Sequence, residues 1–221
     1  MKKTGDGKTE DEKTGDGKMK RTSESERTTK ETSIAIKLSL DGRGEAKLDY
    51  PIGFMAHMLA SFARHGLFDL DIRARGDLEV DQHHLVEDTG IVLGQCFSGA
   101  LGEKRGIRRV GSCLFPMDEA LVQAAVDISG RPFLVFDAGD EGLQSANSSG
   151  IPGFQVCTVQ DFWQGFVSAA GITMHLDILK GRSCHHKIEA LFKAAARSLQ
   201  DACQIEPHVP DLIPSTKGVI A

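Results

Sequence analysis

Hydrophobic and polar residues alternate at the start of the ordered chain, a pattern that predicts β-strands. The apolar residues occupy every second position at Ile34, Ile36, Leu38 and Leu40. They run into Asp41-Gly42, a turn dipeptide, so we expect a β-hairpin to open the fold. A second alternating segment, residues 67–75, stops before Gly76-Asp77 and predicts another strand.

Apolar residues recur elsewhere at the three- and four-residue spacing of amphipathic helices. This spacing predicts one helix over residues 54–64 and a second from His83 to Leu101, with Gly102 in the usual position after a helix C-terminus. The same order returns later in the chain as a helix over 161–170, a strand over 174–179 and a helix over 185–203. The order helix, strand, helix is therefore predicted twice along the chain.

Both long helices begin with the same pattern, HHxxE. It reads HHLVE at 83–87 and HHKIE at 185–189, about half the ordered chain apart. A matching helix and strand precede each copy, which favours an internal duplication over an accidental repeat. We interpret the chain as a duplicated unit of an α+β fold. The first repeat is expected at 28–117, the second at 118–205, and a C-terminal segment at 206–221.

The N-terminal residues 1–27 have the composition of a disordered, low-complexity tail. They mix basic and acidic residues almost evenly, and Met19 is the only apolar side chain after Met1. Such a segment buries too little surface to offset the entropy lost on ordering. KTGDGK occurs twice in it, but the aspartate spacing differs from that of a calcium loop.

Composition and charge narrow the class of protein. The formal net charge of -5 and a sequence pI near 5.9 argue against a nucleic-acid-binding protein, which would carry a strongly basic footprint. No apolar run approaches the ~18 residues that span a bilayer. The 5 cysteines form no CxxC pair and leave one over in any disulfide scheme, which favours a reducing compartment. We therefore expect a cytoplasmic protein with neither nucleic-acid nor membrane partners.

The histidines suggest two metal ions. In each HHxxE helix the first histidine and the glutamate are four residues apart and share a face, whereas the second histidine is rotated by about 100°. Each helix should therefore give a His/Glu pair to one ion and a single histidine to another. Two further histidines complete two sites of three histidines and one glutamate, which together comprise His57, His83, His84, Glu87, His175, His185, His186 and Glu189.

This donor set has the chemistry of a catalytic metal site. Imidazole and carboxylate ligands without thiolates leave open positions on an octahedral ion such as Mn²⁺, Fe²⁺ or Co²⁺. The alternative for any single histidine at a helix start is a capping or surface role, and two HHxxE segments in equivalent places weaken that alternative. His208, next to Pro207, is interpreted as an ordinary surface residue.

Seven motifs in one order resemble the imidazoleglycerol-phosphate dehydratase family. They are KET at 30–32, GFMAHML at 53–59, GDLEVDQHHLVEDT at 76–89, PMDEAL at 116–121, DISGRP at 127–132, HHKIEALFKAAARSL at 185–199 and PSTKG at 214–218. The resemblance implies a two-layer α/β sandwich that duplicates a β-β-β-α-β-α unit, the ribosomal protein S5 domain 2-like fold. It also implies manganese-dependent dehydration of D-erythro-imidazoleglycerol phosphate to imidazole acetol phosphate, a step of L-histidine biosynthesis. Trimers assembled into a 24-mer, with two Mn²⁺ per active site shared between subunits, are implied as well.

The resemblance also assigns roles to individual residues. The eight metal ligands fall on the histidines and glutamates named above. Glu31 and Asp118 correspond to acid/base groups. Substrate and phosphate contacts correspond to His65, Arg109, Arg131, Lys193, Ser215 and Lys217. Guanidinium, ammonium and hydroxyl donors suit a phosphate dianion.

Two departures from the family pattern keep other functions open. Ala56 stands where family members usually carry an aspartate beside the first metal-binding histidine, and Ser61 stands where a glutamine is common. A metal-binding oligomeric scaffold without turnover is therefore one alternative. A dinuclear metallohydrolase is another, although such sites usually include a carboxylate that bridges the two ions.

Overall fold

The computed structural model describes residues 21–139, 142–143 and 150–220. The first half contains β1 (Thr22–Thr28), β2 (Thr32–Ser39), β3 (Ala46–Asp49), α1 (Gly53–Gly66), β4 (Asp69–Gly76) and α2 (His83–Leu101). The second half contains β5 (Val110–Met117), β6 (Ala120–Asp127), β7 (Phe133–Asp137), α3 (Thr158–Ala170), β8 (Thr173–Lys180) and α4 (Cys184–Cys203). Both halves follow β-β-β-α-β-α, so the predicted duplication and its unit are confirmed.

The two sheets share one topology. Their strand orders are β1-β2-β4-β3 and β5-β6-β8-β7. In each sheet the last pair, β3 with β4 or β7 with β8, is parallel and the other pairs are antiparallel. The two mixed sheets therefore have the same strand order and the same pairing directions.

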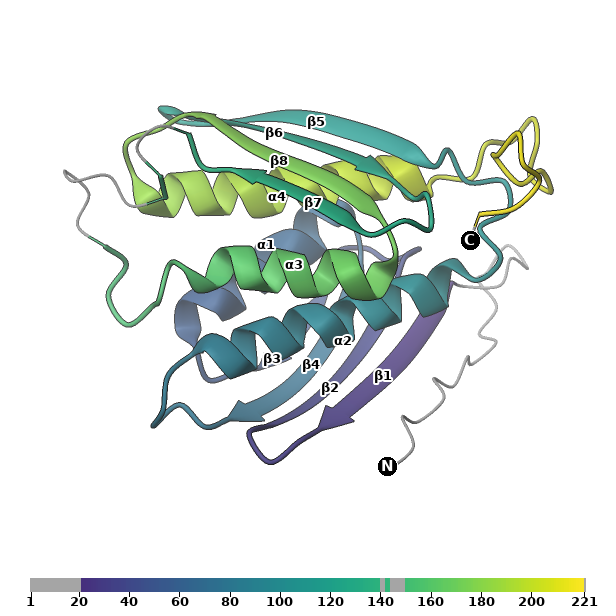
Figure 1. The fold of residues 1–221 in the computed structure, drawn as a ribbon. Coiled ribbons are helices and arrows are strands. Elements are labelled where there is room, and N and C mark those ends of the chain that lie inside the picture. The colour runs from purple at the N-terminus through teal and green to yellow at the C-terminus, as the bar shows by residue number, and fades with distance from the viewer. Residues whose placement is uncertain (1–20, 140–141, 144–149, 221) are drawn as a thin grey trace.

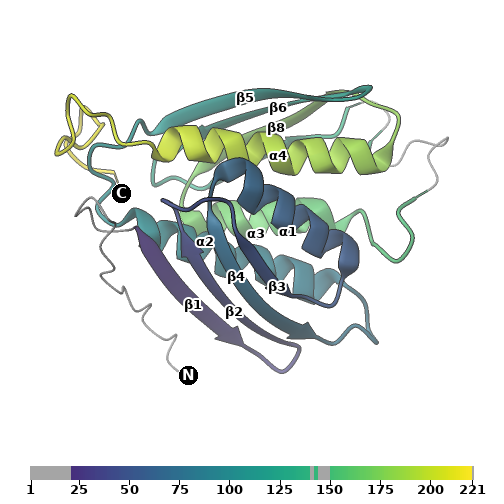
Figure 2. The same ribbon diagram turned by 180° about the vertical axis from the view of Figure 1, so that it is seen from behind.

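The helices lie between the two sheets, which form the outer layers (Figure 1). Helix α2 packs on β1 and β2, and α4 packs on β5 and β6. Each shorter helix packs against the long helix of the other half: α1 lies against α4, and α3 lies against α2. Figure 2 shows the α1 and α4 pair from the back. Each half is a two-layer α/β unit as expected, and the two halves interlock helix to helix.

Two expectations about the N-terminal region were wrong. The opening hairpin joins β1 to β2, with Thr28 paired to Ser33, instead of following Asp41-Gly42. Strand β1 also lies inside the segment 1–27 that was expected to be a disordered tail. Its sequence, TSESERT, contains no aliphatic residue, and only Ser23 within it is buried. The remainder of the predicted tail, residues 1–20, lies outside the described residues.

The expected boundary between the repeats at 117/118 was also wrong. It falls in the turn between β5 and β6, which pair antiparallel along their whole length. The second half therefore begins with β5, at Val110. The C-terminal segment folds back beside the linker before β5, where the backbone N–H of Gly106 donates to the carbonyl of Leu212 at 2.8 Å. No helix in the described ranges is long and apolar enough to cross a membrane.

Glycines allow α2 and α3 to approach closely. A Cβ added at Gly90 would overlap the backbone carbonyl of Phe162, and one added at Gly94 would overlap that of Phe166. These two glycines are one helical turn apart and face the same side of α2. The two helix backbones therefore lie in contact at these two glycines.

Replacing Gly90 by alanine should destabilise the fold although alanine is the better helix former. Overpacking a close contact of this kind costs about 1–3 kcal/mol. The matched control is Gly53→Ala at the start of α1, where an added Cβ meets nothing within 4 Å. Urea unfolding of the metal-free proteins at equal concentration measures the difference. Equal stability of the two variants would show that α2 and α3 can separate without cost.

Candidate metal centre

Three side chains from two helices converge at the start of α4. His57 comes from α1, and His185 and Glu189 come from the first turns of α4. The Nε2 atoms of His57 and His185 lie 3.3 Å and 3.0 Å from Oε2 of Glu189. These three residues form a possible metal-binding group, here called the α4 cluster. Because α1 belongs to the first half and α4 to the second, the packing of these two helices against each other creates this cluster.

The glutamate of the α4 cluster is held as a carboxylate. Glu189 is 7% exposed, and its Oε1 accepts from Nζ of Lys193 at 2.7 Å. Burial acts to raise the pKa of Glu189, but the hydrogen bond and charge of Lys193, with a smaller contribution from His57, lower it overall. An ionised carboxylate can accept from both imidazoles or bind a cation.

A related group occurs at the start of α2. Nε2 of His83 lies 3.7 Å from Oε2 of Glu87, one turn along the helix. The other ring nitrogen, Nδ1, lies 3.2 Å from Oδ2 of Asp161 on α3. We call His83 and Glu87 the α2 pair. Both HHxxE helices thus bring their first histidine and their glutamate together.

The second histidine of each pattern faces a different carboxylate. Nδ1 of His84 lies 3.1 Å from Asp77, and Nδ1 of His186 lies 2.7 Å from Glu119. The hydrogen bond with Asp77 raises the pKa of His84; desolvation opposes this rise, and the charge of Glu31 adds to it. The hydrogen bond from His186, helped by the backbone N–H of Ser183, lowers the pKa of Glu119 to about 2.

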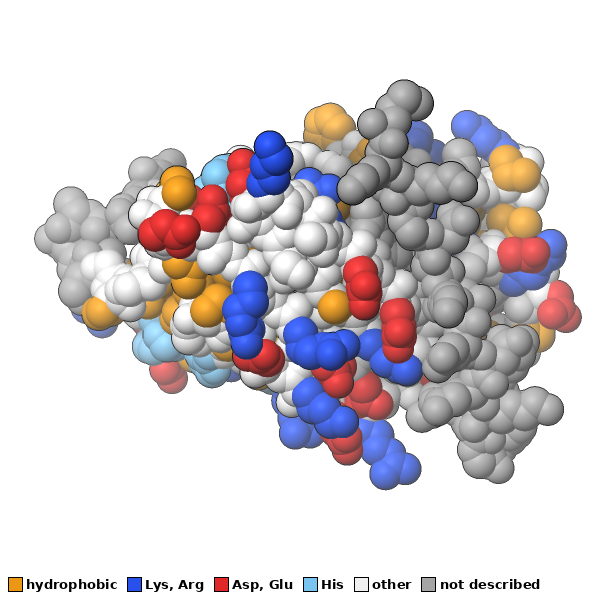
Figure 3. Space-filling model, turned by 90° about the horizontal axis from the view of Figure 1, so that it is seen from below, with side chains coloured by type: hydrophobic (Ala, Val, Ile, Leu, Met, Phe, Trp, Pro, Cys, Tyr) orange, Lys and Arg blue, Asp and Glu red, His pale blue; other side chains and the backbone are white. Residues whose placement is uncertain are grey.

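Both groups lie at one end of the molecule. The side chain of Gln82, just before α2, donates to the carbonyl of Gly153 at 2.8 Å. In the same loop Phe154 packs on Phe54 at 4.8 Å between ring centroids, and Phe54 contacts the ring of His185 at 5.2 Å. In Figure 1 the chain enters α2, α3 and α4 from the same side, and Figure 3 shows histidines gathered at that end.

His175 lies elsewhere in the chain. It is exposed on β8, whose neighbouring residues Met174 and Leu176 are buried against the helices. Because side chains alternate along a strand, His175 points to the outer face of the second sheet. The fold therefore does not bring His175 to the α4 cluster within one chain.

The residues expected to bind phosphate form two separate groups. Arg109 has a left-handed backbone, with φ 72, and its guanidinium donates to both oxygens of Asp127 at 2.7 and 3.1 Å. It also donates to the carbonyl of Pro214 at 2.8 Å, which brings the segment with Ser215 and Lys217 beside it. Arg131 reaches the same Asp127 at 3.9 Å. This first group lies beyond the C-terminal end of α4.

The second group lies midway along α4. Lys193 has its Nζ 5.8 Å from the ring centre of Phe115, and His65 meets the same ring edge-on at 5.4 Å. Desolvation, followed by the charge of Lys193, lowers the pKa of His65. This pair is adjacent to the α4 cluster, whereas the Arg109 group is not.

The two expected acid/base residues occupy equivalent turns of the two halves. Glu31 is exposed in the β1–β2 turn, and Asp118 is exposed in the β5–β6 turn with a left-handed φ of 48. Oδ2 of Asp118 lies 3.7 Å from Nε2 of His186. Each half therefore places one exposed carboxylate beside the second histidine of its HHxxE helix.

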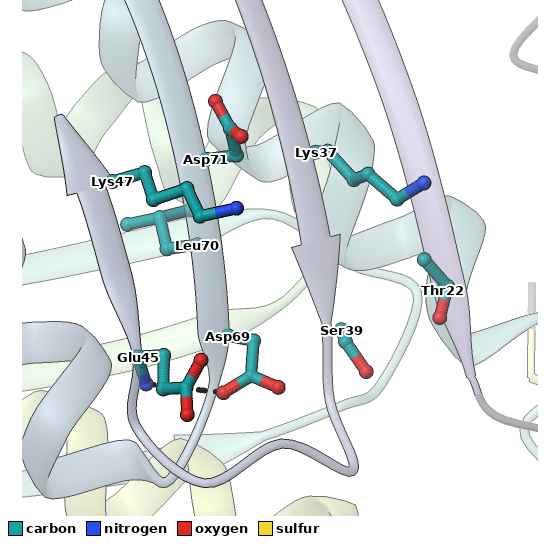
Figure 4. Close-up of a pocket in the computed structure, with 8 residues that line it drawn as sticks. All are labelled: Thr22, Lys37, Ser39, Glu45, Lys47, Asp69, Leu70 and Asp71. Atoms are coloured by element: carbon teal, nitrogen blue, oxygen red, sulfur yellow. Dashed lines mark hydrogen bonds between the residues drawn. The ribbon is translucent and has the colours of Figure 1, made fainter. Parts of the chain in front are cut away.

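A shallow hollow on the outer face of the first sheet has a different character (Figure 4). Its lining mixes charges of both signs: Thr22, Lys37, Ser39, Glu45, Lys47, Asp69, Leu70 and Asp71. Asp69 accepts the backbone N–H groups of Arg43 and Glu45 at 2.7 and 3.0 Å, which explains it as a turn-stabilising residue. The hollow contains none of the residues expected to bind metal or substrate.

Sequence reasoning missed Asp77 and Asp161 and gave Glu119 no role of its own. The duplication could have indicated Asp161, because helices α1 and α3 are equivalent. His57 and Asp161 both lie ten residues before the left-handed residue that ends their helix, Leu67 or Gly171. A comparison of the two halves position by position would have placed Asp161 opposite His83.

The donors at this end suit a divalent ion of intermediate hardness. Imidazole nitrogens and carboxylate oxygens converge in the α4 cluster without a thiolate, because the nearby Cys184 is buried and not part of it. Mn²⁺, Fe²⁺ and Co²⁺ accept such mixed ligands in octahedral sites with open positions. The residues present therefore fit the manganese that the sequence motifs imply.

Removing one member of the α4 cluster should weaken metal binding. His185→Ala is expected to lower the affinity for Mn²⁺ by at least about tenfold, the loss that follows even from removing an outer hydrogen-bond partner. His208→Ala, a change of an exposed histidine outside the centre, is the control. Titration of metal-stripped protein, with free Mn²⁺ followed by electron paramagnetic resonance, gives both constants. Equal constants would exclude His185 as a ligand.

Comparison with known proteins gives a consistent family. A family model described as imidazoleglycerol-phosphate dehydratase matches residues 50–199. Among the similar relatives, the imidazoleglycerol-phosphate dehydratase of Lacticaseibacillus casei is 52% identical over 90% of this chain and 100% of its own. That of Acinetobacter baumannii strain AYE is 48% identical over 90% of this chain and 95% of its own.

Solved structures agree with the sequence relatives. The Staphylococcus aureus imidazoleglycerol-phosphate dehydratase superposes with a TM-score of 0.72 at 35% identity, covering 83% of this chain and 99% of that one. The Pyrococcus furiosus enzyme gives 0.73 at 32% identity, covering 88% and 99%. Sequence, fold and the two HHxxE helices point the same way: the chain belongs to the imidazoleglycerol-phosphate dehydratase family, a family of hydro-lyases.

Proposed function

We propose that this chain removes water from D-erythro-imidazoleglycerol phosphate to give imidazole acetol phosphate, a step of L-histidine biosynthesis, with manganese as cofactor. The observation that carries the proposal is the α4 cluster, a His/His/Glu group inside a chain about half identical to enzymes of that name. The reaction requires loss of a carbon-bound proton that no carbonyl acidifies. A metal centre beside the substrate's imidazole would supply the missing stabilisation.

The ligands divide between two manganese ions in this proposal. The α4 cluster supplies two histidines and a glutamate to one ion, and the α2 pair supplies a histidine and a glutamate to the other. His84, His186 and His175 complete the two sites. Since His84 and His186 are turned away from the glutamates of their own helices, they are suited to reach a different ion.

One chain alone cannot hold both ends of the substrate. His185 begins α4, whereas Arg109 donates its backbone N–H to Ala202 near the end of α4. Seventeen residues of helix separate them by about 25 Å, far more than the length of a small imidazole phosphate. The metal-binding end and the Arg109 group must therefore meet across two copies of the chain. We take the trimer and 24-mer implied by the sequence motifs as the assembly.

The outer faces of the two sheets fit such an assembly. Around His175, the second sheet exposes a set of large apolar side chains: Val110, Leu114, Phe133 and Leu179. The outer face of the first sheet instead carries basic and acidic residues intermixed (Figure 3). Apolar patches of this kind mark contact surfaces. Contact through the second sheet would carry His175 to a metal site of a neighbouring subunit.

The phosphate would be bound by cations and hydroxyls from both copies. Arg109 and Arg131 share Asp127, which holds two guanidiniums at one place beside Ser215 and Lys217. Lys193 and His65 approach from the side of the α4 cluster. Binding at the far end of the substrate also fixes the reacting carbons, so proximity contributes to the rate.

Two carboxylates would move the protons. Bound Mn²⁺ supplies Lewis-acid stabilisation of negative charge on the substrate's imidazole. Glu31, exposed beside His84, takes the proton from the side-chain carbon next to the one that bears the leaving hydroxyl. Asp118, beside His186, delivers a proton to that hydroxyl, which leaves as water. The resulting enol converts to the ketone product, and we place this chemistry in the cytoplasm.

The central test is turnover of imidazoleglycerol phosphate by metal-stripped protein, with and without added Mn²⁺. We expect imidazole acetol phosphate to form only when Mn²⁺ is present, because substrate activation depends on the metal. Bound Mn²⁺ and assembled particles without product would instead indicate a scaffold, and release of inorganic phosphate would indicate a hydrolase. Ala56→Asp would then show whether the missing carboxylate accounts for the loss.

Substitutions of residues at the two ends of the bound substrate should change different kinetic constants. Glu31→Gln removes a proton-transfer group and should lower kcat by about 10²–10⁴-fold with little change in KM. Lys217→Ala removes a phosphate contact and should mainly raise KM. Glu26→Gln, on strand β1 just before the turn that carries Glu31 and also exposed, is the control for the first change. An unchanged kcat in Glu31→Gln would remove Glu31 from the reaction.

A further inference from the structure

The carboxylates near the imidazoles fall into two classes according to the ring nitrogen they face. Glu87 and Glu189 face Nε2 of the first histidine of their helices, at 3.7 and 3.0 Å, and Asp118 faces Nε2 of His186 at 3.7 Å. Three other carboxylates face Nδ1 instead, at 2.7–3.2 Å: Asp77 with His84, Asp161 with His83, and Glu119 with His186. The distinction holds in both halves of the chain.

The ring nitrogen that faces a carboxylate decides where the imidazole carries its proton. An ionised carboxylate only accepts hydrogen bonds, so the Nδ1 facing it must bear the hydrogen. A neutral imidazole then has its free electron pair on Nε2, the nitrogen available to a metal ion. Metal-binding histidines commonly donate their second nitrogen to an acceptor in this way.

From this geometry we infer that Asp77, Asp161 and Glu119 are positioning residues that hold His84, His83 and His186 in the Nδ1–H form with Nε2 presented to metal. The inference rests on the proposed metal-dependent function, and it adds three carboxylates that bind no ion themselves. Each acts through the imidazole it contacts.

Glu119 is the most firmly anchored of the three. Its Oε2 accepts from His186, while its Oε1 accepts the backbone N–H groups of Ser183 and Arg182 at 2.8 and 3.2 Å. Those two residues precede α4 directly, and Ser183 also caps the helix by accepting from the N–H of His186. Glu119 therefore joins the β5–β6 turn to the start of α4, which fixes the ring in two directions.

Asp77 plays the corresponding part in the first half through a different element. It follows β4, and its backbone N–H donates to the carbonyl of Glu31 at 3.1 Å. The turn residue of the first half, Glu31, thus remains exposed while Asp77 engages His84. In the second half the turn itself supplies the positioning carboxylate. The duplicated turns have therefore diverged in their side-chain roles.

Asp161 shows the same divergence between α1 and α3. It occupies the position in α3 that His57 occupies in α1, yet it contacts Nδ1 of His83 whereas His57 contacts Glu189. The α2 pair accordingly has no third ligand equivalent to His57. A carboxylate that orients His83 takes that place.

The experiment compares Mn²⁺ affinity and histidine tautomer in full-length, metal-stripped protein. Glu119→Ala, Asp77→Ala and Asp161→Ala should each weaken Mn²⁺ binding by about 10–100-fold, the range for removing such partners. Glu119→Gln keeps an acceptor and should lose less. Glu103→Ala, an exposed carboxylate at the other end of α2, is the control and should bind as the unaltered protein does. Circular dichroism confirms that each variant is folded.

Nitrogen-15 spectra of histidine-labelled, metal-stripped protein test the orientation directly. We expect the Nδ1–H form at His186 in the unaltered protein and a shift to the Nε2–H form in Glu119→Ala. Unchanged affinity and an unchanged tautomer in all three alanine variants would overturn the inference. If the unaltered protein failed to bind Mn²⁺ or to turn over, the proposed function would fail, while the spectra would still decide the tautomers.

Discussion

The close contact between α2 and α3 is the constraint on which the rest of the structure depends. Gly90 and Gly94 leave room for the backbone carbonyls of Phe162 and Phe166, so two helices from different halves lie backbone to backbone. In the equivalent contact, α1 packs against α4. Because both helix contacts lie between the sheets, neither half can move without displacing a helix of the other.

These helix contacts between the halves bring the candidate metal-binding residues together. The α4 cluster takes one histidine from α1 and two residues from α4, so it exists only when the halves are interlocked. Asp161 of α3 reaches His83 of α2 for the same reason. Helix starts gather at one end of the molecule and the Arg109 group lies at the other, so the proposed function requires these two ends to meet between copies of the chain.

The sequence was informative where periodicity and composition were strong. The two HHxxE patterns located both long helices, their equivalent positions and the duplication. Strand β1 was missed because it meets α2 through Ser23, Ser25 and Arg27, which show no apolar alternation. The carboxylates that face Nδ1 were missed for another reason. Asp77, Asp161 and Glu119 reach their histidines through loops, turns and the packing of helices from different halves, and residue spacing along the chain does not reveal such contacts. The motif resemblance supplied roles for Arg109 and Lys217 that charge alone would not have distinguished from surface residues.

The packing of helices between the halves also makes each unit depend on the other. A single β-β-β-α-β-α unit would have its shorter helix and its long helix exposed, each lacking the partner that the other half now provides. Because both units are in one chain, their equivalent turns and helices can differ, so that α1 carries His57 where α3 carries Asp161.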